Sequence, residues 1–256
     1  MRLTRCHLGL PLAVDLTLDL PERVAGHLRR VLRLGPGARL VLFNGDGFDY
    51  EAELLPPEGR TARARVLTRH RLDNESSLHI VLAQAVARGE KMDFVLQKAT
   101  ELGVTAIIPI LTERTEVRLD AERGDKRHQH WQGVIASACG QSGRARLPHL
   151  LPAMPLATWL EQPPTPGVDA QAGLPAQRLP LHHLDPEAAE TVRGLGELPA
   201  RGGCFVIGPE GGLGERDLAR LSAAGSRGLR LGPRVLRTET AGLALLAALQ
   251  ALQGDF

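Results

Sequence analysis

Residues 204–212 read Cys-Phe-Val-Ile-Gly-Pro-Glu-Gly-Gly, and residues 229–241 read Leu-Arg-Leu-Gly-Pro-Arg-Val-Leu-Arg-Thr-Glu-Thr-Ala. In both stretches an apolar run, typical of a buried strand, leads into a glycine-containing turn. Strands that end in such turns expose backbone N–H and C=O groups at the carboxyl edge of a parallel sheet, where open α/β sheets bind ligands. Small residues let a flat ligand approach the backbone closely. The two stretches therefore predict an α/β domain with a ligand site at these turns.

The residues of the two turns exclude one kind of site and leave another question open. Gly212 is not followed by the Gly-Lys-Ser/Thr ending of a Walker loop, so the first turn is a poor phosphate loop. In the second turn Thr238 or Thr240 can cap the helix that follows. Capping does not explain why Arg237 and Glu239 share that turn. On the residues alone, each turn could also be purely structural.

The stretch upstream of these turns alternates between strand-like and helix-like patterns. Leu78–Ala85 and Val104–Leu111 are apolar runs typical of buried parallel strands, and Glu90–Leu102 has an apolar stripe at helical spacing. Such alternation indicates an α/β domain with a parallel sheet. Further along the chain we predict helices around Trp131, at Pro186–Val192, Glu215–Ala224 and Thr240–Gln253, and strands at Leu179–Leu184, Cys204–Gly208 and Leu229–Gly232.

The first 72 residues follow a different pattern. Short alternating stretches predict strands, and an Asn-Gly-Asp-Gly turn predicts a hairpin between two of them. With one helix, these strands predict a small β-barrel. We therefore divide the chain into residues 1–72 and 73–256. The predicted elements of the barrel are strands at Leu12–Leu20, Arg39–Phe43, Phe48–Leu55 and Thr61–Arg69, and a helix that begins at Pro21 and ends before Gly35.

Charge is unevenly spread along the 256 residues. The net charge is only +2, yet residues 1–71 hold 12 Arg against 8 Asp and Glu. A basic N-terminal module fits a polyanionic partner, although a solvated charged face would have the same composition.

The cysteines, histidines and apolar stretches indicate where in the cell the protein works and whether it binds a metal. The 3 cysteines form no CxxC pair, which indicates reduced thiols. We see no signal peptide, and the longest apolar stretch, Ala241–Leu252, is too short to cross a membrane. No His/Cys cluster has the spacing of a metal site. We therefore expect a cytoplasmic protein with no bound metal and no membrane contact, and we interpret His182 and His183 as loop residues rather than ligands.

Several motifs together resemble a known family. These are the two glycine turns, Gln97–Val104 (QKATELGV), Glu113-Arg114-Thr115 and Gln141–Arg144 (QSGR), in this order. The turns are similar to the cofactor loops of SPOUT methyltransferases, and the whole set resembles the RsmE family, the bacterial 16S ribosomal RNA uridine N3-methyltransferases. The segment 27–33 resembles that family's PUA-like RNA-binding barrel. The resemblance covers nearly the whole chain and is weakest over residues 150–200, which hold half of the 18 prolines.

The resemblance implies a fold and a reaction. The fold would be a SPOUT-type α/β domain with a parallel sheet and a deep C-terminal trefoil knot, preceded by the PUA-like barrel. The reaction would be transfer of a methyl group from S-adenosyl-L-methionine to N3 of a specific uridine, U1498 of 16S ribosomal RNA, within the assembled small ribosomal subunit. A homodimer is implied too. The apolar helix 240–253 is compatible with a dimer interface, but a helix buried in the monomer explains it equally well. Pro180 interrupts the strand expected to supply a first cofactor loop.

The chemistry of N3 methylation suggests roles for particular residues. Our hypothesis is that Glu210 or Glu239 assists removal of the N3 proton, and that Arg237, together with Arg114 or Arg144, binds phosphate or the uracil oxygens. The residues expected to contact RNA are Arg5, Arg30, Arg33, Arg114 and Arg144. The residues expected to bind the cofactor are Ile207, Gly208, Pro209, Glu210, Gly211, Gly212, Leu231, Gly232, Val235, Leu236, Thr238, Thr240 and Ala241.

Two alternatives remain open from the sequence. A SPOUT enzyme that methylates a ribose 2′-hydroxyl would share the glycine turns but not the motifs at Gln97–Val104 and Gln141–Arg144. A non-catalytic RNA-binding or ribosome-assembly protein could keep the fold without binding the cofactor.

Overall fold

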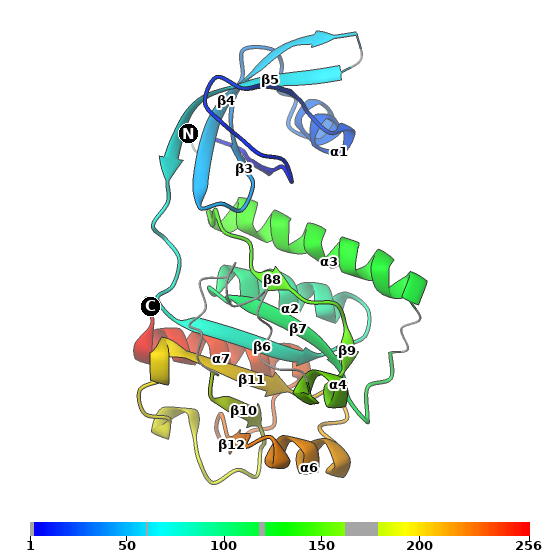
Figure 1. The fold of residues 1–256 in the computed structure, drawn as a ribbon, viewed down its shortest axis with the longest axis vertical. Helices are drawn as coiled ribbons and strands as arrows, with labels where there is room; N and C mark the ends of the chain where they lie inside the picture. Colours follow the sequence, from blue (N-terminus) through cyan, green and yellow to red (C-terminus); the bar gives the residue numbers. More distant parts are fainter. Residues whose placement is uncertain (1–2, 60, 118–120, 162–178) are drawn as a thin grey trace. The chain divides into compact units, whose positions relative to one another are not determined.

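The computed structural model describes residues 3–256 except 60, 118–120 and 162–178 (Figure 1). Contacts within the chain divide it into two compact units, one formed by Met1–Glu75 with Ala136–Leu147 and the other by Ser76–Ile135 with Pro148–Phe256. Part of the proline-rich stretch that resists interpretation, residues 162–178, lies outside the described residues.

The first unit is built on a five-stranded sheet in the order β1-β3-β4-β5-β2. β1 runs parallel to β3, and the other neighbours are antiparallel. The hairpin predicted around the Asn-Gly-Asp-Gly turn is confirmed as β3 and β4. Leucines such as Leu8, Leu28 and Leu40 fill the core beneath the sheet. The strands are β1 (Arg5–His7), β2 (Thr17–Asp19), β3 (Arg39–Phe43), β4 (Phe48–Glu58) and β5 (Thr61–Arg71).

Two predictions for this unit need correction. The strand predicted over Leu12–Leu20 pairs only over Thr17–Asp19, because Asp15 has a φ of 67° and the N–H of Leu16 turns back to the carbonyl of Ala13. The helix predicted from Pro21 is short: α1 (Glu22–Gly26) continues directly into a π-helical turn, η1 (His27–Val31). Turns of this kind are rare and often lie at functional sites.

Arg5 ties the sheet of the first unit to the end of the long helix α3 (Ala121–Ser142). Its guanidinium forms a bidentate pair with Asp49 of β4, with Nε 3.0 Å from Oδ2. It also donates to the carbonyls of Cys139 (2.9 Å) and Arg144 (3.1 Å). The side chain of Arg5 is only 5% exposed, so these contacts are made out of water.

The second unit is built on a parallel sheet in the order β12-β10-β11-β6-β7-β8, with β9 also paired to β7. The β6–β11 pair is central, and its apolar residues are shielded on both faces. The strands are β6 (His79–Ala85), β7 (Ala106–Leu111), β8 (His149–Leu150), β9 (Met154–Pro155), β10 (Leu181–Leu184), β11 (Gly202–Ile207) and β12 (Arg227–Leu229).

Helices cover both faces of this sheet (Figure 1). α2 and α7 pack against each other on the face to which Leu82 and Gln84 point, whereas α4 and α6 cover the face of Val81 and Ala83. These helices are α2 (Glu90–Glu101), α4 (Leu156–Glu161), α6 (Glu215–Ala223) and α7 (Thr238–Gln253), and two short 3₁₀ turns are η2 (Val192–Gly194) and η3 (Pro199–Arg201).

The predicted α/β class with a parallel sheet is confirmed, and most predicted elements of this unit are present. The helix predicted over Pro186–Val192 is wrong, because Asp185 accepts a hydrogen bond from the N–H of Glu187 and holds a turn there. The strand predicted over Leu229–Gly232 ends at Leu229. The trefoil knot stays a prediction. Among the described residues, no helix is long and apolar enough to span a membrane.

We predict that Asp49→Ala destabilises the protein by about 3 kcal/mol, because it leaves the buried Arg5 guanidinium without its counter-ion. The matched control is Glu51→Ala on the same strand as Asp49. Glu51 is one of two carboxylate partners of the half-exposed Arg39 of β3, so its loss should cost less than about 1 kcal/mol. Urea unfolding followed by circular dichroism measures both. Equal losses in the two variants would contradict the prediction.

Candidate functional site

A cavity of about 530 Å³ lies where β10, β11 and β12 end. The carboxyl ends of parallel strands are the expected place for a ligand in a sheet of this kind. Most residues that the sequence assigned to the cofactor line this cavity, namely Ile207, Gly208, Pro209, Glu210, Gly212, Leu231, Gly232, Val235, Leu236, Thr238 and Ala241, as does Arg237. Gly211, Thr240 and Glu239 are not part of its lining.

The first wall is the tight turn after β11. A side chain at Gly208 would bring its Cβ to 3.1 Å from the backbone nitrogen of Leu213, so any other residue there would push the two sides of the turn apart. The N–H of Gly212 donates to the carbonyl of Pro209 (2.9 Å), and Gly212 has a φ of +72°, which favours glycine. The composition of this turn thus follows from its backbone path.

A neighbouring loop holds this turn from outside. Arg114 donates to the carbonyl of Gly211 (2.8 Å). The carboxylate of Asp217, which is 1% exposed, accepts hydrogen bonds from the N–H groups of Glu113 (3.0 Å) and Gly214 (3.2 Å). The Glu113-Arg114-Thr115 motif therefore supports the wall of the cavity.

Thr238 joins the two walls at the start of α7. Its hydroxyl donates to the carbonyl of Gly208 (2.6 Å) and accepts from the side-chain amide of Gln84 (3.0 Å). Thr238 is 5% exposed and Gln84 is fully buried. The expectation that Thr238 or Thr240 caps this helix is wrong, because the N-cap residue of α7 is Arg237 and no side chain makes a capping hydrogen bond. Thr238 instead joins the two glycine turns.

The second wall is the segment of residues 231–236 between β12 and α7, and its backbone forms no hydrogen bonds with described residues of the protein. In the described part of the chain, no hydrogen bond is formed by any backbone group of residues 231–236. All of these residues except Pro233 line the cavity. These residues are half-buried or exposed, so water can satisfy their peptide groups, and a ligand held against the segment can take the place of that water.

A third wall follows β10. Leu184, Asp185 and Pro186 line the cavity, and the N–H of Asp185 donates to the carbonyl of Leu229 (3.0 Å). A first cofactor loop was expected near here, but no individual residue was assigned to it, because Pro180 interrupts the strand that would supply it. β10 begins at Leu181, directly after that proline. The place of this loop in the chain could have identified it, because a loop that follows a strand parallel and adjacent to β11 lies at the same edge of the sheet.

One end of the cavity carries opposite charges. Lys91, near the start of α2, lies with its Nζ 3.1 Å from Glu210 Oε1 and 3.5 Å from Glu239 Oε2. The hydrogen bond to Glu210 raises the pKa of Lys91. Partial burial acts to raise the pKa of Glu210, but hydrogen bonds from backbone N–H groups and from Lys91 outweigh it, and the pKa lies below its usual value. Sequence reasoning missed Lys91, although it follows β6, the strand next to β11.

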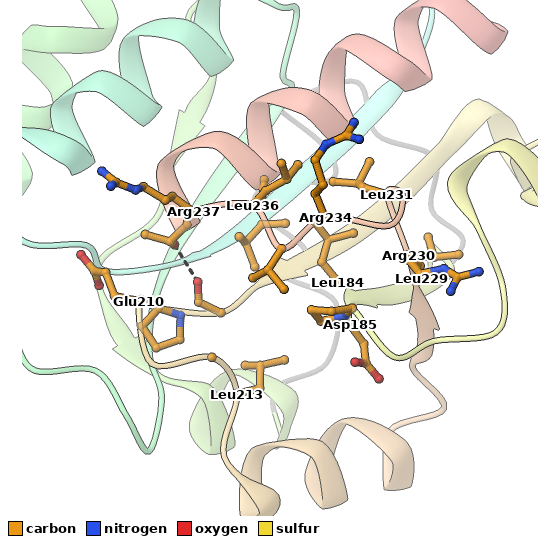
Figure 2. A pocket seen from close by; sticks show the side chains of 18 of the residues that line it. Leu184, Asp185, Glu210, Leu213, Leu229, Arg230, Leu231, Arg234, Leu236 and Arg237 are labelled. Carbon is orange, nitrogen blue, oxygen red and sulfur yellow. Dashed lines mark hydrogen bonds between the residues drawn. The ribbon is translucent and has the colours of Figure 1, made fainter.

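Figure 2 shows how the labelled side chains are distributed along the cavity. Glu210 and Arg237 lie at one end, Asp185 and Arg230 lie at the other, and leucines together with Arg234 lie between them. Such a cavity suits a ligand with a flat apolar middle and polar or charged ends. Within the described residues, Arg237 has no ion-pair partner, so its guanidinium is available to an anion.

The arginines predicted to contact RNA differ in their surroundings. Arg5 is engaged with Asp49, and Arg144 is 6% exposed and paired with Glu75 (2.6 Å). Arg30 and Arg33 are exposed in the first unit, and Arg114 is exposed but hydrogen-bonded to the turn after β11. The RNA contacts of all of these residues stay a prediction.

His182 and His183 are not loop residues, which corrects our interpretation. They lie in β10, where His182 stacks on Phe205 and His183 hydrogen-bonds Ser226 (2.9 Å). Burial lowers the pKa of both imidazoles. No group of metal-binding residues forms among the described side chains. The thiols of Cys139 and Cys204 are buried, and burial raises their pKa to about 12, so neither is suited to act as a nucleophile.

Comparison with known sequences agrees with this geometry. Residues 74–250 match a family model described as RNA methyltransferase domain, and residues 20–67 match one described as RNA methyltransferase PUA domain. Ribosomal RNA small subunit methyltransferase E of Mycobacterium tuberculosis is 33% identical over 88% of this chain and 83% of its own length. The Bacillus subtilis protein of the same name is 28% identical over 93% of each chain.

Solved structures agree as well. A ribosomal RNA small subunit methyltransferase E from Neisseria gonorrhoeae, solved with S-adenosylmethionine, is 38% identical and has a TM-score of 0.86 over the full length of both chains. A methyltransferase from Legionella pneumophila, also solved with that cofactor, is 34% identical with a TM-score of 0.89. Because the family model spans well over half of the sequence and these relatives cover nearly all of it, the chain belongs to the RsmE family of ribosomal RNA small subunit methyltransferases.

Proposed function

We propose that the protein transfers a methyl group from S-adenosyl-L-methionine to N3 of one uridine, U1498, of 16S ribosomal RNA. The observation that carries the proposal is the cavity between the glycine turns, with its partnerless backbone over residues 231–236 and its charged ends. Two relatives of the same fold were solved with S-adenosylmethionine, and the relatives with printed functions are named for the small-subunit RNA.

The residues of the cavity fit this cofactor. Leu184, Leu213 and Leu236 would pack on the adenine ring, and the free peptide groups of residues 231–236 would hydrogen-bond its edge. The carboxylate of Asp185 would meet a hydroxyl or an ammonium group at its end of the cavity. When bound, the cofactor supplies an electrophilic methyl group, and no metal is needed for its transfer.

The residues at the charged end of the cavity would help to remove the N3 proton of the acceptor uridine and would stabilise the negative charge that results. The N3 proton of uridine must leave for the nitrogen to act as a nucleophile, and the negative charge then spreads to the two uracil oxygens. Glu210, which lines the cavity, or Glu239, which lies 3.5 Å from Lys91 outside its lining, would help to remove the proton. Arg237 would stabilise the charge on an oxygen or hold the adjacent phosphate. Lys91 keeps Glu210 ionised and in place.

The target uridine must be unpaired or flipped out, because base pairing hides N3 in the Watson–Crick edge. Exposed arginines of the first unit, Arg30 and Arg33, would contact the phosphates of flanking RNA. Arg114 would act nearer the cavity, and Arg5 and Arg144 would act by holding the surface on which RNA lies. We further propose a cytoplasmic homodimer that acts on the assembled small subunit.

Helix α7 offers limited support for that homodimer. Leu245, Leu246 and Leu249 are fully buried within the unit, so most of the apolar character of the helix is explained by monomer packing. Leu252 is 51% exposed and remains for a second copy. Sedimentation equilibrium would settle the oligomeric state, and a monomer at micromolar concentration would contradict this part of the proposal.

The reaction is tested by mass mapping of 16S RNA from cells with and without the gene. The expected result is loss of one methyl group on the base of one uridine. A nuclease-resistant dinucleotide that disappears instead would support ribose 2′-hydroxyl methylation. An unchanged map, together with no heat of S-adenosylmethionine binding in calorimetry, would favour a non-catalytic RNA-binding protein.

We predict that Arg237→Ala lowers the single-turnover methylation rate by about 10²-fold, because it removes a cation at the end of the cavity where the negative charge would develop. Calorimetry should show nearly unchanged binding of S-adenosylmethionine. The matched control is Arg220→Ala, an exposed arginine of α6 that does not line the cavity, and its rate should stay at the wild-type value. An unchanged rate in Arg237→Ala would remove this residue from the mechanism.

We predict that Lys91→Met moves the acid limb of the pH–rate profile to higher pH. The Lys91 ammonium holds the pKa of Glu210 below its usual value, so its loss lets that pKa rise, and the ionised carboxylate is then lost at a higher pH. Single-turnover rates across the acid range measure the shift. Lys98→Met is the control, since Lys98 pairs with Glu101 on the same helix and outside the cavity. The same profile in both variants would contradict a role for Lys91.

A further inference from the structure

The first unit contains a second large cavity, of about 780 Å³, which has no part in the methyl-transfer site. β1, α1 and the π-helical turn η1 form its walls, and the last turns of α3, including Ser137 and Gln141, form its floor. All of the residues that line it belong to the first unit. Its size is in the range of cavities that hold small ligands rather than single ions.

The charges that line this cavity are all positive. Arg5, Arg23 and Arg30 contribute guanidinium groups, His7 and His27 contribute imidazoles, and the lining contains no aspartate or glutamate. Arg5 is neutralised by Asp49. Arg23 and Arg30 form no ion pair with any described residue, so two exposed cations remain unbalanced.

The π-helical turn accounts for the place of Arg30. The turn brings the guanidinium of Arg30 back over Gly26, where even a methyl group at position 26 would collide with it. Arg23 lies close enough to β1 for its charge to lower the pKa of His7, in addition to the larger effect of burial. Both cations therefore lie at the cavity.

The cavity also has an apolar and hydrogen-bonding side. Leu3 and Val31 line it and are 36% and 66% exposed, which leaves apolar surface next to the cations. Gln141 and Ser137 supply polar groups from α3. Paired cations suit a phosphate, an apolar patch suits a ribose or a base face, and polar side chains suit a base edge.

We infer that this cavity binds one nucleotide of single-stranded RNA, with Arg23 and Arg30 on its phosphates and its base over Val31. The inference rests on the proposed function, since it names where RNA outside the target uridine is held. It assigns roles to Arg23, Val31 and Gln141, and it gives the π-helical turn a purpose that packing alone does not supply.

The test uses the full-length protein and a short fluorescein-labelled single-stranded oligoribonucleotide in anisotropy titrations between 50 and 200 mM KCl. Arg23→Ala and Arg30→Ala should each weaken binding about tenfold at the lower salt. Each should also reduce the slope of log K against log salt by about 0.7. Arg29→Ala is the matched control, because Arg29 lies in the same helical segment, pairs with Glu22 and does not line the cavity. Its affinity and slope should equal those of the wild type.

A second variant tests the cavity without removing an arginine. Ser137→Glu places a carboxylate on the exposed floor and should weaken RNA binding at least as much as the loss of one arginine, with an unchanged urea midpoint. When small ribosomal subunits are the substrate for methylation, the three cavity variants (Arg23→Ala, Arg30→Ala and Ser137→Glu) should have a higher KM and an unchanged kcat.

The outcomes separate this inference from the proposed function. If the wild type methylates 16S RNA but the cavity variants bind RNA as tightly as Arg29→Ala, the inference is wrong and the function stands. If the wild type does not methylate 16S RNA but the cavity variants lose RNA binding, the function is wrong and the nucleotide site stands.

Discussion

The hydrogen bond from the hydroxyl of Thr238 to the carbonyl of Gly208 is the contact on which the site depends. It joins two loops that are separated by a helix and a strand, and it is itself fixed by the buried amide of Gln84. With the loops joined, the peptide groups of residues 231–236 can remain without protein partners and still keep their positions. A binding surface made of backbone needs such an external clamp, because no side chain of its own holds it.

Much of this arrangement was predictable because it follows from local constraints. The strand and turn around Gly208–Gly212 are encoded by apolar residues followed by glycines, and the hairpin of β3 and β4 by its Asn-Gly-Asp-Gly turn. Where the prediction failed, a local turn overrode the pattern. Asp15 broke an alternating strand, and the turn held by Asp185 replaced a predicted helix.

The parts that could not be predicted depend on residues far apart in the sequence. Lys91 and Asp185 reach the cavity only because β6 and β10 flank β11 in the sheet. The periodicity of apolar residues predicts strands, but it does not predict their order in the sheet. The roles of Arg5 and Arg144 could not be inferred either. An arginine in an RNA-binding family suggests a phosphate contact, yet both guanidinium groups are largely buried and paired with carboxylates of their own unit. Only the partners of a charged side chain decide between these uses.

The helix α3 belongs to both compact units, since Ala136–Leu147 group with the N-terminal 75 residues. The barrel is therefore not a contiguous stretch of the chain: Arg5 finds two of its acceptors, the carbonyls of Cys139 and Arg144, more than 130 residues downstream. A gene fragment that ended at the boundary suggested by sequence would encode a barrel lacking those acceptors. Such a module cannot be transferred with all of its contacts as one contiguous segment of the gene.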